Sequence, residues 1–106
     1  MMHWTPTEAA ACTAGETDIL LIDVREPEEF ALCRLEGAQL LPLSEMSQWE
    51  SELAASDRPL LIYCHHGVRS ARVCARLASL GHPEAINLAG GIDRWSLEVD
   101  DSIPRY

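Results

Sequence analysis

The 106-residue sequence contains no lysine, so all eight of its basic side chains are arginines. They are outnumbered by seventeen acidic residues, which gives a formal net charge of −9. Such a surface repels nucleic acid and anionic lipid, and no apolar run approaches the roughly 20 residues that span a bilayer. We therefore expect no nucleic-acid partner and no membrane partner, and we look instead to small molecules or proteins.

Disulfide motifs and targeting signals are missing as well. There is no CxxC motif, and nothing indicates an oxidising compartment, so we expect all four cysteines to be reduced thiols. The first ten residues lack the basic start and the apolar stretch of a signal peptide, which predicts a cytoplasmic protein. The length predicts a single domain over residues 1–106, without repeats, linkers or low-complexity tracts.

Apolar runs typical of buried strands alternate with helical segments along the chain. The runs cover residues 18–24, 37–43, 59–64 and 85–91. The predicted helices cover residues 6–12, 26–33, 44–55, 69–80 and 92–99, with a capping box at Thr5 and Glu8, a cap at Ser44 and a closing glycine at Gly81. This alternation predicts an α/β fold around a parallel sheet, whose ligands bind where the strands end.

The segment from Cys64 to Arg69 joins a predicted strand to a helix N-terminus. Unpaired N–H groups and the helix dipole favour negative charge there, and Gly67 allows successive amides to point inward around an anion. A cysteine at this place is stabilised as a thiolate, and Arg69 is expected to add a positive charge. A packing role for Cys64 would explain neither Gly67 nor Arg69, so we interpret Cys64 as a nucleophile.

His65 and His66 raise the question of a metal site. Adjacent side chains diverge in a strand or a tight loop, and the ligand spacings of structural zinc sites are absent. We expect no metal here; the two histidines are expected to contribute backbone amides and to shape the rim of the pocket.

Four segments, in order along nearly the whole chain, resemble the rhodanese family of single-domain sulfurtransferases. They are "LIDVREPEEF" from Leu21, "LEGAQLLPL" from Leu35, "CHHGVRS" from Cys64 and "NLAGGIDRW" from Asn87. The resemblance implies a five-stranded, mostly parallel sheet with helices on both faces.

The same resemblance implies a covalent sulfur transfer. Cys64 would attack a sulfane sulfur, from thiosulfate or a persulfide, and hold it until a thiol or cyanide takes it. No cofactor is expected. The active loop would consist of the residues that follow Cys64, which are His65, His66, Gly67, Val68, Arg69 and Ser70. Asp23 and Arg25, at the same sheet edge, are expected to form an ion pair that fixes loops, with a secondary role in positioning the active loop.

Two alternatives stay open beside the enzyme. One is a phosphatase or arsenate reductase of this fold. The phosphatase loops enclose five residues between cysteine and arginine, whereas Cys64 and Arg69 enclose four, and no general acid is evident. A sulfur carrier or protein-interaction module with little turnover is the other alternative; the presence of Cys64 weighs against a purely non-catalytic module.

The remaining cysteines are interpreted as structural. Cys12 lies near a helix end, Cys74 is expected to be buried and inert, and Cys33 is expected to pack near the end of a short helix. Where the family often has a Gly-His pair, this chain has Cys33 and Arg34. A role for Cys33 as a resolving thiol stays open.

Overall fold

The computed structural model describes residues 2–15 and 17–106. Its sheet has the strand order β1-β5-β4-β2-β3, and every neighbouring pair is parallel. The strands are Met2–Trp4 (β1), Leu20–Asp23 (β2), Gln39–Leu40 (β3), Leu60–Tyr63 (β4) and Ala85–Leu88 (β5). The expected parallel α/β architecture is confirmed. The apolar runs did not identify β1, because it is three residues long and only Trp4 is partly buried.

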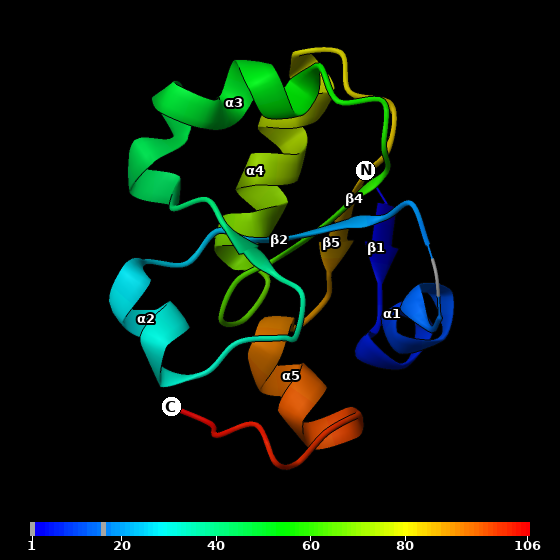
Figure 1. Cartoon of the computed structure of the whole chain (residues 1–106), viewed down its shortest axis with the longest axis vertical. Helices are drawn as coiled ribbons and strands as arrows, with labels where there is room; N and C mark the ends of the chain where they lie inside the picture. The colour runs from blue at the N-terminus through cyan, green and yellow to red at the C-terminus, as the bar shows by residue number, and fades with distance from the viewer. Residues whose placement is uncertain (1, 16) are drawn as a thin grey trace.

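Helices cover both faces of the sheet. They are Pro6–Thr13 (α1), Pro27–Leu32 (α2), Met46–Ala54 (α3), Val68–Ser79 (α4) and Gly91–Glu98 (α5), with a 3-10 helix at Leu43–Glu45 (η1). Helices α3 and α4 pack on one face, and α1 and α5 pack on the other (Figure 1). Within the described part of the chain, no helix combines the length and the apolar character needed to cross a membrane.

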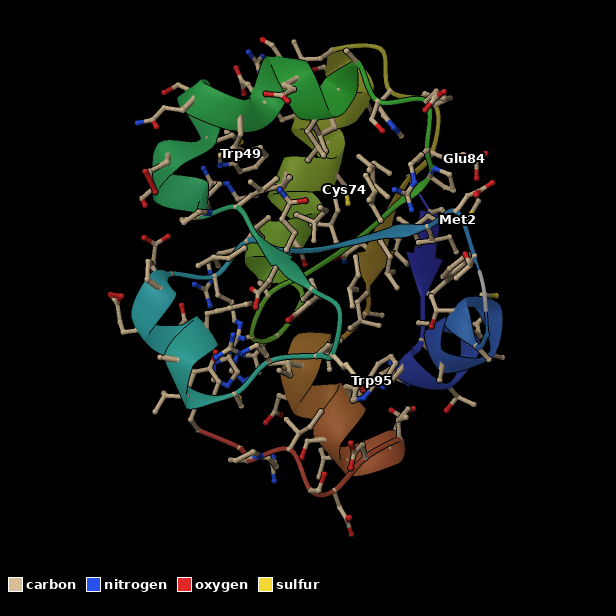
Figure 2. The ribbon with its side chains drawn as sticks, viewed as in Figure 1. Met2, Trp49, Cys74, Glu84 and Trp95 are labelled. Atoms are coloured by element: carbon tan, nitrogen blue, oxygen red, sulfur yellow. The ribbon has the colours of Figure 1, made fainter. Side chains whose placement is uncertain are left out.

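Strand β4 divides the core into two layers because its side chains alternate between the faces. Leu60 and Ile62 point into the layer that also contains Trp49, and Leu61 belongs to the opposite layer, against which Trp95 packs. Figure 2 shows the two tryptophans in these separate regions, Trp49 beside α3 and Trp95 beside α5. All of β4 is therefore buried, as the apolar run predicted.

The predicted helix boundaries agree with the structure to within one residue except at Ser44. Thr5 and Glu8 form the expected capping box, and Gly81 closes α4 with a φ of +100°. Ser44 was predicted to cap the third helix, and this is wrong: it lies inside η1, and α3 begins only at Met46. Its hydroxyl donates to Glu26 Oε1 at 2.6 Å, so it is not available as a cap.

Strand register brings the predicted functional residues to one edge of the sheet. Asp23, the last residue of β2, pairs with Tyr63, the last residue of β4. Arg25 and Cys64 therefore follow neighbouring strands at their carboxyl ends, where parallel sheets bind ligands.

The N-terminus of α5 packs directly against the loop after Cys64. The Ile92 N–H donates to the Cys64 carbonyl at 3.0 Å, and the Asp93 N–H donates to the His65 carbonyl at 3.1 Å. A Cβ on Gly91 would lie 2.4 Å from the His65 carbonyl oxygen, so only glycine allows this approach.

Candidate active site

The thiol of Cys64 lies inside the cup that the sequence predicts. Its Sγ accepts from the Gly67 N–H at 3.1 Å and from the Ser70 N–H at 3.4 Å, and the Ser70 hydroxyl oxygen lies 3.4 Å from it. Gly67 has a φ of +94° at the N-terminus of α4, and this conformation turns its N–H toward the sulfur. A negative charge on sulfur would be stabilised by these donors and by the helix dipole.

Asn87 in β5 links the groups that contact the sulfur. Its Oδ1 accepts from the Ser70 hydroxyl at 2.5 Å, and its Nδ2 donates to the Gly67 carbonyl at 3.2 Å. On its outer side, Nδ2 lies 3.1 Å from Nδ1 of His3. The sequence analysis missed this residue, although a polar side chain in the middle of an apolar run was a usable signal.

Arg69 does not stand free at the far end of the cup, contrary to expectation. Its guanidinium donates to both carboxylate oxygens of Glu29 in α2, at 2.6 and 2.9 Å. These hydrogen bonds lower the pKa of Glu29 to about 2. The positive charge of Arg69 is thus paired, and the backbone amides are left as the main attraction for an anion. Glu29 was missed because it stands among several acidic residues.

Asp23 and Arg25 form the ion pair that the sequence predicts. Both side chains are fully buried, and Arg25 Nη2 donates to Asp23 Oδ2 at 2.7 Å. The same nitrogen donates to the Cys33 carbonyl at 2.6 Å, which ties the end of α2 to β2. Removing one partner of such a buried pair leaves an uncompensated charge and is strongly destabilising. A role in positioning the active loop stays a prediction.

The side chains of His65 and His66 were expected to diverge, but they lie together because the loop bends at these residues. Their ring centroids lie 3.8 Å apart with planes tilted by 31°, and ligand atoms of both come within 4.8 Å of each other and of Asp93. Such a group could hold a transition metal. The Asp93 carboxylate, however, already accepts from Arg105 at 2.8 and 3.3 Å, so we assign these residues to the polar rim of the loop. Val68, the remaining loop residue, is exposed.

The other three cysteines have different surroundings from Cys64. Cys74 is fully buried, and this burial, with a smaller effect of Cys64, raises the pKa of its thiol to about 12. Cys33 is buried at the end of α2, as expected. Cys12 is exposed on α1, so no packing supports the structural role that was expected for it. All four are free thiols.

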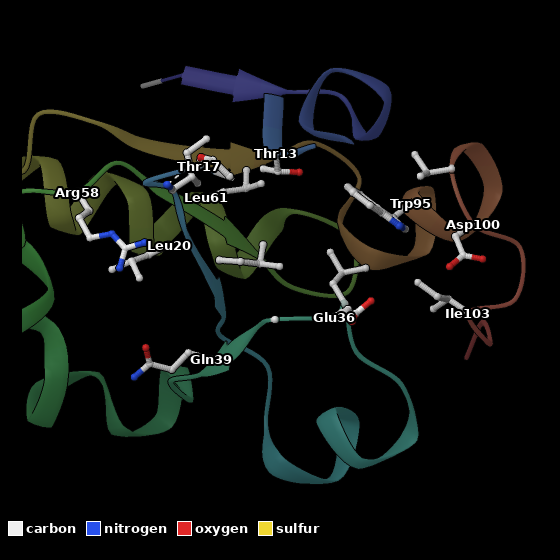
Figure 3. A pocket seen from close by; sticks show the side chains of 15 residues that line it. Thr13, Thr17, Leu20, Glu36, Gln39, Arg58, Leu61, Trp95, Asp100 and Ile103 are labelled. Atoms are coloured by element: carbon white, nitrogen blue, oxygen red, sulfur yellow. Dashed lines mark hydrogen bonds between the residues drawn. The ribbon is translucent and has the colours of Figure 1, made fainter. Parts of the chain in front are cut away.

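A hollow of about 500 Å³ lies on the face of the sheet covered by α1 and α5 (Figure 3). Leu61, Trp95 and Ile103 contribute apolar surface to it, and Thr13 and Asp100 lie at its edge. None of residues 64–70 lines it. The hollow is therefore separate from the cup around Cys64.

The sequence from residue 5 to residue 98 matches the family described as the Rhodanese-like domain. The chain belongs to the rhodanese-like family. It is 42% identical over 86 residues to the uncharacterized protein YqhL of Bacillus subtilis, covering 81% of this chain and 68% of that one. It is 39% identical over 83 residues to a sulfurtransferase of Allochromatium vinosum, covering 78% and 77%.

A solved structure supports the same assignment. A rhodanese-like domain protein from Staphylococcus aureus superposes with a TM-score of 0.81 and 26% identity, covering 100% of this chain and 99% of that one. The rhodanese-like fold and family are therefore confirmed. Some other curated relatives are longer, and this chain spans only 26 to 30% of their length.

Proposed function

We propose that this rhodanese-like protein is a sulfurtransferase that carries a sulfane sulfur on Cys64. The observation that supports this most directly is the pair of backbone amides that donate to Sγ, from Gly67 and Ser70, with the Ser70 hydroxyl oxygen beside them. A thiolate and the terminal sulfur of a persulfide are both anions that such a cup stabilises. Sulfurtransferases among the relatives support the same reaction class.

The reaction consists of two displacements at sulfur. The Cys64 thiolate attacks the sulfane sulfur of a donor, the bond from that sulfur to the leaving group breaks, and the leaving group departs with the electron pair, as sulfite when the donor is thiosulfate. An acceptor thiolate then attacks the outer sulfur of the Cys64 persulfide. The Cys64 thiolate is released, and the acceptor leaves as a persulfide, or as thiocyanate when the acceptor is cyanide.

The position of Arg69 bears on the choice of donor. Because its charge is paired with Glu29, it offers little additional attraction to a dianion such as thiosulfate. The net charge of −9 opposes the approach of any anion. We therefore propose a persulfide, offered by a small thiol or by a protein, as a better donor than thiosulfate. The same pairing also disfavours the phosphatase alternative, since no loop arginine is free to hold a phosphate.

Mass spectrometry after incubation with polysulfide tests the proposal. The expected result is the addition of one sulfur atom, mapped to Cys64 and removed by a reductant. Cys64→Ser should abolish the adduct and the turnover, whereas Cys12→Ser, which removes an exposed thiol outside the loop, should change neither. Persistence of the adduct or of thiocyanate formation in Cys64→Ser would refute the assignment. An adduct that forms without repeated turnover would favour the carrier alternative.

A further inference from the structure

Tyr106 lies against the active loop although it is distant from it in sequence. Its ring stacks on the ring of His65, with centroids 3.8 Å apart and planes at 6°. Its hydroxyl accepts from Arg25 Nη1 at 2.9 Å and donates to Glu29 Oε2 at 2.6 Å. Figure 1 shows the chain after α5 running toward α2, the helix that carries Glu29.

These contacts reach both ends of the loop. His65 is the first residue after Cys64, and Tyr106 covers its ring directly. Arg69, at the other end, is held by the Glu29 carboxylate that also accepts from the Tyr106 hydroxyl. The Tyr106 side chain, which we call the strap, therefore links His65 to the Glu29 carboxylate that holds Arg69. Beneath the loop, Cys64 is only 1% exposed.

The neighbouring residue fixes the strap on a second side. Arg105 donates to both oxygens of Asp93, whose own N–H is bonded to the His65 carbonyl. Arg105 and Tyr106 together thus connect α5, α2 and the loop: Arg105 through Asp93, and Tyr106 through Glu29 and His65. The strap is not part of either apolar core layer, so its contacts can open without unfolding the core.

One polar atom under the strap has no partner. His65 Nε2 is buried and makes no hydrogen bond within the described residues. A buried polar group without a partner is costly, and a ligand bound beside the loop would supply one. Burial, together with the neighbouring His66, also lowers the pKa of His65, which keeps this nitrogen uncharged near neutral pH.

We propose that Tyr106 determines the specificity of the Cys64 site by size. Its ring and hydroxyl hold the strap across the loop, so that small sulfur donors and acceptors reach the thiol while bulky ones react slowly. This inference rests on the proposed function only for the identity of the reacting molecules. The claim that Tyr106 limits access to Cys64 does not depend on it.

Alkylation of Cys64 by a small and a bulky reagent of the same chemistry tests the inference without any sulfur transfer. Iodoacetamide and an iodoacetamide attached to a large fluorophore are compared in a Cys12→Ser background, which removes the exposed thiol. In Tyr106→Ala, the ratio of the bulky to the small rate should rise about tenfold, because the strap no longer limits access. Tyr106→Phe keeps the ring on His65 but loses the hydroxyl contacts with Arg25 and Glu29, so its ratio should lie between those of the wild type and Tyr106→Ala.

Circular dichroism and thermal melting establish that each variant is folded. An unchanged ratio in folded Tyr106→Ala would overturn the inference. Equal acceleration of both reagents would overturn it too, because general loosening of the loop does not discriminate by size. If the wild-type protein forms no persulfide, the proposed function fails while the alkylation ratio still decides the role of Tyr106.

Discussion

Two of the three buried thiols, Cys64 and Cys74, differ sharply in their surroundings. Cys64 precedes α4 and Cys74 lies within it, both almost completely inaccessible to solvent and both in the same core layer. The sulfur of Cys64 has two backbone N–H donors, from Gly67 and Ser70. The sulfur of Cys74 is surrounded by apolar groups, and the pKa of its thiol is raised to about 12.

The comparison shows that burial alone does not prepare a cysteine for attack. Burial away from water disfavours a thiolate at both Cys64 and Cys74, and only the loop around Cys64 compensates with backbone N–H donors. The supporting structure differs as well. Charged side chains such as Glu29 and Arg69 hold the loop region, whereas close apolar packing holds Cys74. Changes to the loop should therefore alter the reaction, and changes around Cys74 should alter only stability.

The largest effect is expected from Gly67→Ala. The position has a φ of +94°, and an added Cβ would lie 3.0 Å from the Gly90 nitrogen, so the backbone must move and its N–H turns away from Sγ. Loss of one positioned donor to a reacting anion typically costs a factor of about 100 or more. We expect sulfur transfer to fall by about 100-fold, measured as single-turnover persulfide formation.

Gly81→Ala is the matched control for this variant. Its φ is +100°, but a Cβ there meets nothing within 4 Å. It should cost about 1 kcal/mol of stability through backbone strain and leave transfer unchanged. If folded Gly67→Ala transferred sulfur as fast as Gly81→Ala, the amide cup would not be responsible for the reactivity of Cys64.

The sequence predicted the parts of this site that depend on local pattern. Apolar runs located four strands, and the glycine after a strand located the loop. The paired state of Arg69 was not predictable, because Glu29 is one of several acids in its segment and only the fold brings it to the loop. Tyr106 was missed for the same reason: its contacts with His65 and Glu29 join residues far apart in the chain.

A smaller effect is expected from the charge pair that holds the loop. The pKa of Glu29 falls from an ordinary 4.5 to about 2 in the folded protein, through its hydrogen bonds to Arg69. A lowered pKa contributes stability that is present above about pH 4.5 and is lost as the pH falls toward 2. Glu29→Gln should therefore cost about 2 kcal/mol at pH 7, after allowance for partial solvent screening, and progressively less below pH 4.5.

Urea unfolding of both proteins over a pH series measures this difference. Glu50→Gln is the control, because Glu50 pairs with Arg76 between α3 and α4, near the surface and away from the loop. Its effect should be smaller, because Arg76 in this pair is more exposed to solvent than Arg69 and the attraction is screened. A Glu29→Gln penalty that stays constant from pH 7 to pH 3 would contradict the assignment of the stabilisation to the carboxylate charge.

The smallest effect on the reaction is expected from Cys74→Ala. The side chain is fully buried among apolar groups, so its truncation leaves a small cavity that costs about 1 kcal/mol. The thiol should stay protonated at neutral pH because burial raises its pKa to about 12, and a protonated thiol is a poor nucleophile. Persulfide formation at Cys64 should therefore match the wild-type rate, while urea unfolding shows the lower stability. Sulfur transfer by a folded Cys74→Ala protein could instead fall as far as it does in Gly67→Ala. That result would mean that the Cys74 thiol takes part in the reaction. The different surroundings of Cys64 and Cys74 would then not explain a difference in their reactivity.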